Sequence, residues 1–200
     1  MSSISDAIVK DHRELERYYN KVVNSVNLDH QERFSNQFTW ELAHHSVAEE
    51  LIIYLAFEKY LGPKGKEMAE NDRKEHYRDT DYKKVKELLK EFQQLKPKEP
   101  EYILKLKEIW TLLSKHIEEE EDRDLPALKG ALQNQFGESE SMAKSFSRTK
   151  AFVPSRSHPS AGEHPPFETV MGLMTAPIDH IADVFRKFPD QTISPNPSTE

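Results

Sequence analysis

Apolar residues recur at steps of three and four along the first 125 residues, which is the spacing of one face of an α-helix. The first such stripe runs through Ile8, Leu15, Tyr19, Val22 and Val26. Ser3 or Ser5 is the predicted N-cap of this helix. Neither glycine nor proline occurs before Gly62, and no strand-like alternation of useful length competes with the helical pattern. The first part of the chain is therefore predicted to be helical.

Three more helices follow from the same pattern. The second begins with Asp29 as its predicted cap and ends at Gly62-Pro63, and the third starts at Pro63 and ends before the linker at residues 97–100. The fourth starts at Pro100 and is expected to break before Pro126. Helices of roughly 22 to 30 residues with short connections predict an all-α fold, an up-and-down antiparallel four-helix bundle over residues 1–132.

The composition changes after Gly130, where serine, proline, glycine and phenylalanine become more frequent, and eight of the twelve prolines lie beyond residue 150. Two short helices are predicted near residues 167–174 and 177–188. Their apolar residues are Phe167, Met171, Met174, Ile178, Ile181 and Phe185. Because these are too many for a free tail, residues 133–200 are predicted to form a C-terminal arm that packs on the bundle or on a second copy of it.

Composition removes several classes of function. The chain has no cysteine, which excludes disulfides, thiolate catalysis and iron–sulfur clusters. No secretory signal and no apolar run long enough to span a membrane are visible. The formal net charge of −7 argues against nucleic acid as a partner. We therefore expect a cytoplasmic protein that binds neither membrane nor nucleic acid.

The most informative residues are histidines and acids on the apolar faces of the four helices. His45 and Glu49 are four residues apart and share one face, and His116 and Glu120 repeat this arrangement in the fourth helix. The complete set of candidate metal ligands is His12, His45, Glu49, Asp72, His76, His116 and Glu120. Any one of these could be an ordinary core or surface residue, but one group per helix at similar depth favours a shared site.

Burying so many imidazoles and carboxylates without a partner would cost several kcal/mol per charged group. A bound cation removes that cost, and imidazole with carboxylate suits iron, manganese or zinc. Even without Asp72, the four histidines and two glutamates exceed the four ligands of an ordinary zinc site, so we predict two metal ions bridged by Glu49 and Glu120. Iron is the expected metal, with manganese or zinc as substitutes. His44, about 100° round the helix from His45, is expected at the surface or behind a ligand. Glu121 has the same expected position and is the best reserve ligand.

These residues and the strings around them resemble the hemerythrin-like, or HHE cation-binding, domain over about residues 5–132. The strings are Asp11-His12-Arg13, His45-x-x-x-Glu49, Glu75-His76, and His116-x-x-x-Glu120 running to Leu125-Pro126. The later string Phe152-Val-Pro-Ser-Arg-Ser-His-Pro-Ser is similar to the C-terminal extension of fungal members. The resemblance implies a four-helix bundle with a non-heme di-iron centre that binds or reacts with dioxygen.

One departure bears on function. Oxygen-carrying members have a second histidine one turn before the residue that resembles His76, and here that position is Asp72. Asp72 could bind a metal directly, bind it through water, or orient His76, and each role argues against a simple oxygen carrier. The alternatives are a di-iron oxygenase or oxidase (an oxidoreductase) acting on a small organic substrate, an iron- or oxygen-responsive binding module, and a metal-free structural bundle.

Overall fold

The structure is a computed structural model that describes residues 2–77, 81–153, 182–183, 185–190 and 192, without the side chains of residues 72–77, 81–84 and 86. Its elements are α1 (Ile4–Val23), α2 (Leu28–Ala48), η1 (Glu49–Ile53), α3 (Tyr54–Tyr77), α4 (Asp81–Phe92), α5 (Glu101–Glu119), η2 (Glu120–Asp124), α6 (Leu125–Ala131) and α7 (Glu138–Lys150), where η marks a π-helical turn. The described part of the chain contains helices and no strands, so the all-α prediction is confirmed. None of the helices described combines the length and the apolar character needed to cross a membrane.

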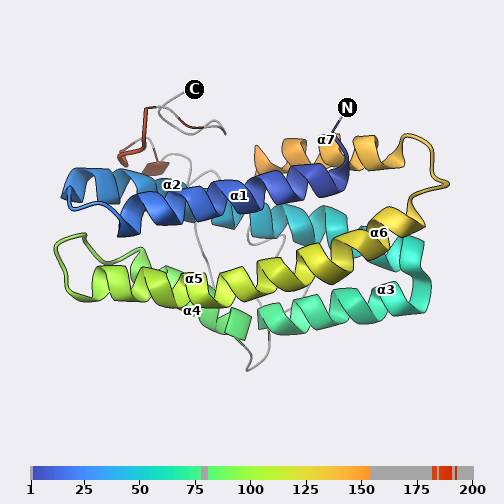
Figure 1. The fold of residues 1–200 in the computed structure, drawn as a ribbon, viewed down its shortest axis with the longest axis horizontal. Coiled ribbons are helices and arrows are strands. Elements are labelled where there is room, and N and C mark those ends of the chain that lie inside the picture. The colour runs from blue at the N-terminus through green and yellow to red at the C-terminus, as the bar shows by residue number, and fades with distance from the viewer. Residues whose placement is uncertain (1, 78–80, 154–181, 184, 191, 193–200) are drawn as a thin grey trace.

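The helices form two layers of long rods (Figure 1). α1 and α2 pack against each other along most of their length, and α7 lies against both. In the other layer, α5 continues through η2 into α6 as one rod, which contacts α4 at one end and α3 at the other. The predicted third helix corresponds to the part of α3 after Gly62 and to α4, and α7 is an additional helix that the hydrophobic pattern did not predict.

Helix α1 begins where the sequence predicted. Ser3 is its N-cap, and a capping box joins the side chains and backbone of Ser3 and Asp6. Two details differ from the prediction. α1 ends at Val23, which leaves Val26 99% exposed instead of on the buried face. The cap of α2 is Asn27 and not Asp29, because the Asn27 side chain reaches the backbone N–H of His30.

The chain turns sharply at Gly62, as predicted. Gly62 has φ 60° and ψ −135°, a conformation that favours glycine, and Pro63 follows it at once. Gly65 is also required, because a Cβ there would lie 1.8 Å from the carbonyl oxygen of Phe57. These residues allow the second half of α3 to turn back against the first.

The predicted break before Pro126 is wrong. Pro126 lies in the first turn of α6, directly after η2. Proline needs no hydrogen-bond acceptor because it has no N–H group, so it is tolerated at the start of a helical segment. The rod formed by α5, η2 and α6 therefore continues to Ala131.

The interior contains two apolar clusters. One is built mainly by α1 from Leu15 onward, the middle of α2, α4 and α5. The other is built mainly by the start of α1, η1, α3, α6 and α7. In α1 the change from one cluster to the other falls between Leu15 and Ile8, which flank His12. In the α5–α6 rod it falls between Ile117 and Leu125, which flank Glu120. His12 and Glu120 therefore lie between two apolar cores.

Part of the predicted C-terminal arm can be followed. Phe188 is 2% exposed, and its carbonyl oxygen accepts a hydrogen bond from Arg33 of α2 at 2.9 Å. Phe185, which was expected to pack on the bundle, is 85% exposed, so Phe188 and not Phe185 is the buried aromatic of this segment. The predicted helix at residues 167–174 and half of that at 177–188 lie outside the described residues, and residues 185–188 are not helical.

Candidate metal centre

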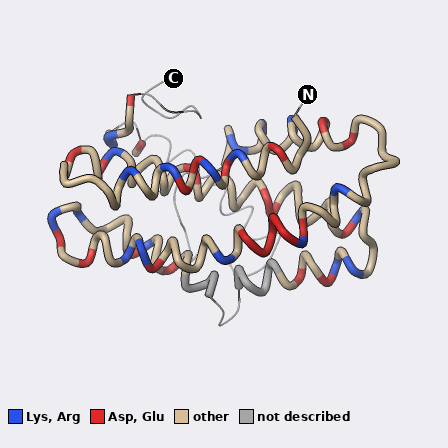
Figure 2. Tube along the Cα trace, viewed as in Figure 1, with Lys and Arg blue, Asp and Glu red and all other residues tan. Residues whose placement is uncertain are grey.

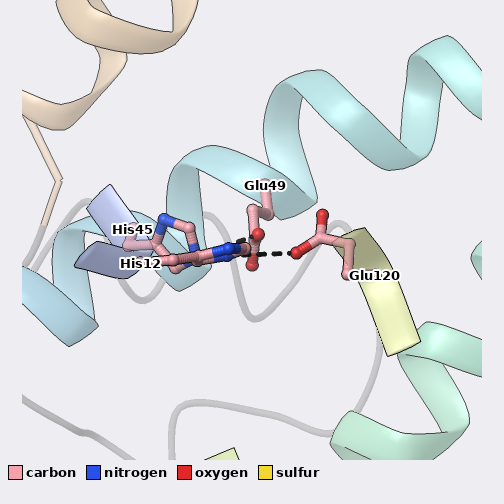
Figure 3. Close-up of side chains that lie close together, drawn as sticks. All are labelled: His12, His45, Glu49 and Glu120. Atoms are coloured by element: carbon pink, nitrogen blue, oxygen red, sulfur yellow. Dashed lines mark ion pairs between the residues drawn. The ribbon is translucent and has the colours of Figure 1, made fainter. Parts of the chain in front are cut away.

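Four of the predicted ligands meet in the space between the two apolar clusters. One ligand atom each from His12, His45, Glu49 and Glu120 lies within 4.8 Å of the other three, and all four residues are buried. The Nε2 atom of His45 lies 3.0 Å from Oε1 of Glu49, and the Nε2 atom of His12 lies 3.2 Å from Oε2 of Glu120. The two imidazoles and two carboxylates point toward a common centre (Figure 3).

Both glutamates begin a π-helical turn. Glu49 is the first residue of η1 and Glu120 the first of η2. Each accepts, at its backbone oxygen, the N–H of the residue five positions later, Tyr54 or Leu125. On the N-terminal side the spacing is still α-helical, because the N–H of Glu49 bonds to the carbonyl of His45. Single π-turns in helices are often found at functional sites, and here one accompanies each His-x-x-x-Glu motif.

A carboxylate from outside the cluster fixes the far side of each histidine. Nδ1 of His12 lies 2.8 Å from Oε1 of Glu121, whose other oxygen accepts a hydrogen bond from Arg13 at 2.5 Å. Nδ1 of His45 lies 3.4 Å from Oδ2 of Asp11. Since a carboxylate only accepts hydrogen bonds, Nδ1 of each ring carries the hydrogen and Nε2 faces the centre. This is the usual arrangement around metal-binding histidines.

The charges in the cluster are strongly coupled. Burial by itself lowers the pKa of His45, but Glu49 and Asp11 outweigh it and raise that pKa to about 10. Burial raises the pKa of Asp11, but the hydrogen bond with His45 and the charge of Lys150 bring it down to about 2. The pKa of Glu49 is likewise lowered, against its burial, chiefly by His45. Both nitrogens of His45 thus face carboxylates. These negative charges favour a positive charge at the site, which either a proton or a metal ion can supply.

The donor set fits a metal ion. Nε2 of His12, both carboxylate oxygens of Glu49 and Oε2 of Glu120 are buried, yet none makes a well-directed hydrogen bond within the described part of the chain. Leaving such groups unsatisfied in an apolar surrounding costs several kcal/mol. Coordination would satisfy all of them at once, with the imidazole and carboxylate donors that iron, manganese and zinc accept.

The other three predicted ligands, His116, Asp72 and His76, are not part of this group of four. His116 lies one helical turn before Glu120 and is half-buried, and its charge helps to lower the pKa of Glu49. It therefore lies near the four clustered residues without belonging to that tight group. Asp72 and His76 are on α3, but their side chains are outside the described part of the structure.

Two neighbours of the predicted ligands, His44 and Glu121, lie outside the cluster. His44, expected at the surface or behind a ligand, is 1% exposed and its ring packs 3.9 Å from that of Trp40, measured between ring centroids. Nδ1 of His44 also lies 2.7 Å from the carbonyl oxygen of Trp40. Glu121, the reserve ligand, lies behind a ligand, as expected, because it contacts the Nδ1 atom of His12. Both residues are adjacent in sequence to cluster residues and point elsewhere.

Asp11 and Lys150 also belong to the site, although the spacing of the sequence did not predict them. Nζ of Lys150 in α7 lies 2.6 Å from Oδ2 of Asp11 and also forms an ion pair with Glu41. The adjacency of Asp11 to His12 was a usable signal, because a helix that presents His12 to the centre brings Asp11 close to it. No local signal connects Lys150 to residues more than 100 positions away.

The acidic run from Glu118 to Asp124 is visible as a patch where α5 passes into η2 (Figure 2). Glu118 and Asp122 are exposed, whereas Glu120 and Asp124 are buried. Glu120 is therefore buried as predicted, whereas Asp124, which was expected on the solvated face, is buried as well.

Comparison with known proteins agrees with this geometry. The family model for the hemerythrin HHE cation binding domain matches residues 3–128. An uncharacterized hemerythrin-like protein of Schizosaccharomyces pombe is 51% identical over 189 residues, which cover 94% of this chain and 89% of that protein. No solved structure gives a significant match. The matched family region contains all seven predicted ligands and ends before α7.

Proposed function

The chain belongs to the hemerythrin HHE cation-binding family, and we propose that it is a non-heme di-iron protein that reacts with dioxygen. The observation that supports this most strongly is the buried group of His12, His45, Glu49 and Glu120, whose inward-facing atoms lack well-directed hydrogen bonds. The family match supports a cation at this position. Iron, the two-ion stoichiometry and dioxygen are the parts of the proposal that need direct measurement.

Seven donors in the matched region favour two ions over one. Glu49 and Glu120 would help to hold the ions, because buried carboxylate oxygens of both residues face the centre of the cluster. His12 and His45 would bind through Nε2, the atom each directs inward. His116, His76 and Asp72 would complete the set. This donor set, rich in imidazole and free of thiolate, suits iron, and manganese or zinc could replace it.

The protein's own residues prepare this site for redox chemistry. Asp11 and Glu121 hold the two imidazoles in one orientation, so little rearrangement is needed when an ion binds. The apolar clusters on either side limit access of water. Bound ferrous iron would supply the electrons that dioxygen accepts. Asp72 adds negative charge where oxygen carriers have a histidine, which favours the oxidised metal and therefore reaction over reversible binding.

The test is a stopped-flow absorbance measurement on protein loaded with ferrous iron without oxygen and then mixed with oxygenated buffer. We expect rapid conversion to the ferric form in the unaltered protein and slower conversion in Asp72→His. The matched control is Asn71→His, one residue away and exposed, which should leave the rate unchanged. No oxygen-dependent change would refute reaction with dioxygen, whereas uptake that reverses on removing oxygen would indicate a carrier. Consumption of oxygen only when an organic compound is added would indicate an oxygenase or oxidase.

A further inference from the structure

Helix α7 carries two side chains directed at the histidine side of the candidate site. Phe146 and Lys150 are four residues apart, so they lie on one face of the helix. The ring of Phe146 stands edge-on to that of His45, with 6.0 Å between ring centroids and an angle of 81° between the planes. Phe146 is 1% exposed and belongs to the second apolar cluster. One face of α7 therefore covers His45.

Lys150 supplies the positive charge for two buried acids. Its ammonium group pairs with Asp11 of α1 and with Glu41 of α2, whose side chains are 7% and 0% exposed. A buried carboxylate without a counter-charge is strongly destabilised, and removing one partner of such a group leaves the other uncompensated. Lys150 thus enables Asp11 to remain a buried carboxylate.

Asp11 uses one oxygen for both contacts. The Oδ2 atom that accepts from Lys150 at 2.6 Å is also the atom 3.4 Å from Nδ1 of His45. A contact series therefore runs from Lys150 through Asp11 to His45 and ends at Glu49. Each step is a hydrogen bond or ion pair between buried or nearly buried groups.

We propose that Lys150 is a positioning residue for the metal centre, through which α7, a helix outside the matched family region, sets the orientation of His45 and the affinity of the site for metal. Lys150 acts by holding Asp11 against Nδ1 of His45, which keeps Nε2 directed at Glu49. This inference rests on the proposed metal site but not on iron, dioxygen or the number of ions.

The competing explanation is that Lys150 only stabilises the fold by joining α7 to α1 and α2. A thermodynamic cycle separates the two, because a residue that acts through Asp11 loses its effect once Asp11 can no longer hold a charge. The variants are Lys150→Met, Asp11→Asn, the combination of both, and Lys150→Arg as the conservative replacement. Lys144→Met is the matched control, since Lys144 is exposed on the same helix.

The readouts are the affinity for Co²⁺, measured by competition with a chelator, the visible absorption spectrum of the bound Co²⁺, and the thermal stability of protein stripped of metal. Lys150→Met should weaken Co²⁺ binding about tenfold and change the spectrum, with partial recovery in Lys150→Arg. In the Asp11→Asn background, Lys150→Met should have no further effect on affinity. Lys144→Met should bind Co²⁺ as the unaltered protein does.

Two results would overturn the inference. One is an unchanged affinity and spectrum in Lys150→Met. The other is a loss of affinity that persists in full in the Asp11→Asn background, which would assign Lys150 to fold stability alone. If Lys150→Met does not fold, the double variant Lys150→Met/Glu41→Gln, which removes one charge of each sign, takes its place with the same expected results. Failure of the unaltered protein to bind Co²⁺ would instead refute the metal site itself.

Discussion

At the scale of single residues, the site is organised by pairs in which a carboxylate behind the ring directs an imidazole toward the centre. His12 is paired in this way with Glu121 and His45 with Asp11. The spacing of the sequence predicted that His12, His45, Glu49 and Glu120 share inward faces, because that depends only on helical periodicity. It could not predict the pairs, since Glu121 and Asp11 reach their histidines across helix interfaces whose rotation no local pattern specifies.

Substituting Glu121 by glutamine should weaken metal binding about 10- to 100-fold, the usual effect of losing the acceptor behind a metal-binding histidine. The measurement is chelator competition with Co²⁺. The control is Glu118→Gln, since Glu118 is exposed on the same rod. This variant should bind Co²⁺ as the unaltered protein does. Equal affinities in the two variants would mean that Glu121 does not orient His12.

Metal affinity should rise with pH. Because the pKa of His45 is raised to about 10, the ring carries a proton at neutral pH that a metal ion must displace. Release of this one proton should therefore raise the affinity for metal by about tenfold per pH unit at pH values below 10. Chelator competition with Co²⁺ between pH 6 and 8 would measure this slope. A flat profile would show that His45 is already deprotonated or is not a ligand.

At the scale of elements, the predicted helices were correct where the sequence contains a local stop signal, as at Gly62-Pro63. They were wrong where tertiary contacts decide. Pro126 did not end the fourth helix, because η2 precedes it and its ring fits the first turn of α6. The π-turns at Glu49 and Glu120 were not predictable, since each depends on one residue out of phase within an otherwise regular helix. Helix α7 was missed because its few apolar residues form only a short stripe.

The contribution of α7 can be measured with two phenylalanines of opposite exposure. Phe146 is 1% exposed and contacts His45, so Phe146→Ala should lower the free energy of unfolding by about 3–5 kcal/mol. Phe152, two residues beyond the end of α7, is 71% exposed. Phe152→Ala should therefore change the free energy of unfolding by no more than about 0.5 kcal/mol. Chemical denaturation followed by circular dichroism would measure both. Similar losses in the two variants would mean that α7 does not pack as described.

At the scale of the whole molecule, the buried polar cluster lies between two apolar cores. His12 and Glu120 each stand at the position in their rod where one core ends and the other begins. A metal ion bound there would join α1, α2 with η1, and the α5–α6 rod. The stability of the whole bundle should therefore depend on metal, although the ion contacts only a few side chains.

Adding metal should raise the unfolding temperature, because binding to the folded state alone contributes about 2.7 kcal/mol at a hundredfold excess over the dissociation constant. Thermal unfolding would be followed with and without Co²⁺. Glu49→Ala, which removes two of the inward-facing oxygens, should show no such gain. A gain that persists in Glu49→Ala would indicate binding at another position.

The central claim is that the buried His/Glu cluster binds iron, and the most direct test is the iron content per chain of purified protein reconstituted without oxygen. His45→Ala removes a ligand, whereas His44→Ala removes the adjacent buried histidine that contacts Trp40 instead. We predict stoichiometric iron, with two ions per chain, in the unaltered protein and in His44→Ala, and loss of iron in His45→Ala. Absence of iron in the unaltered protein, or equal iron in His44→Ala and His45→Ala, would contradict the claim.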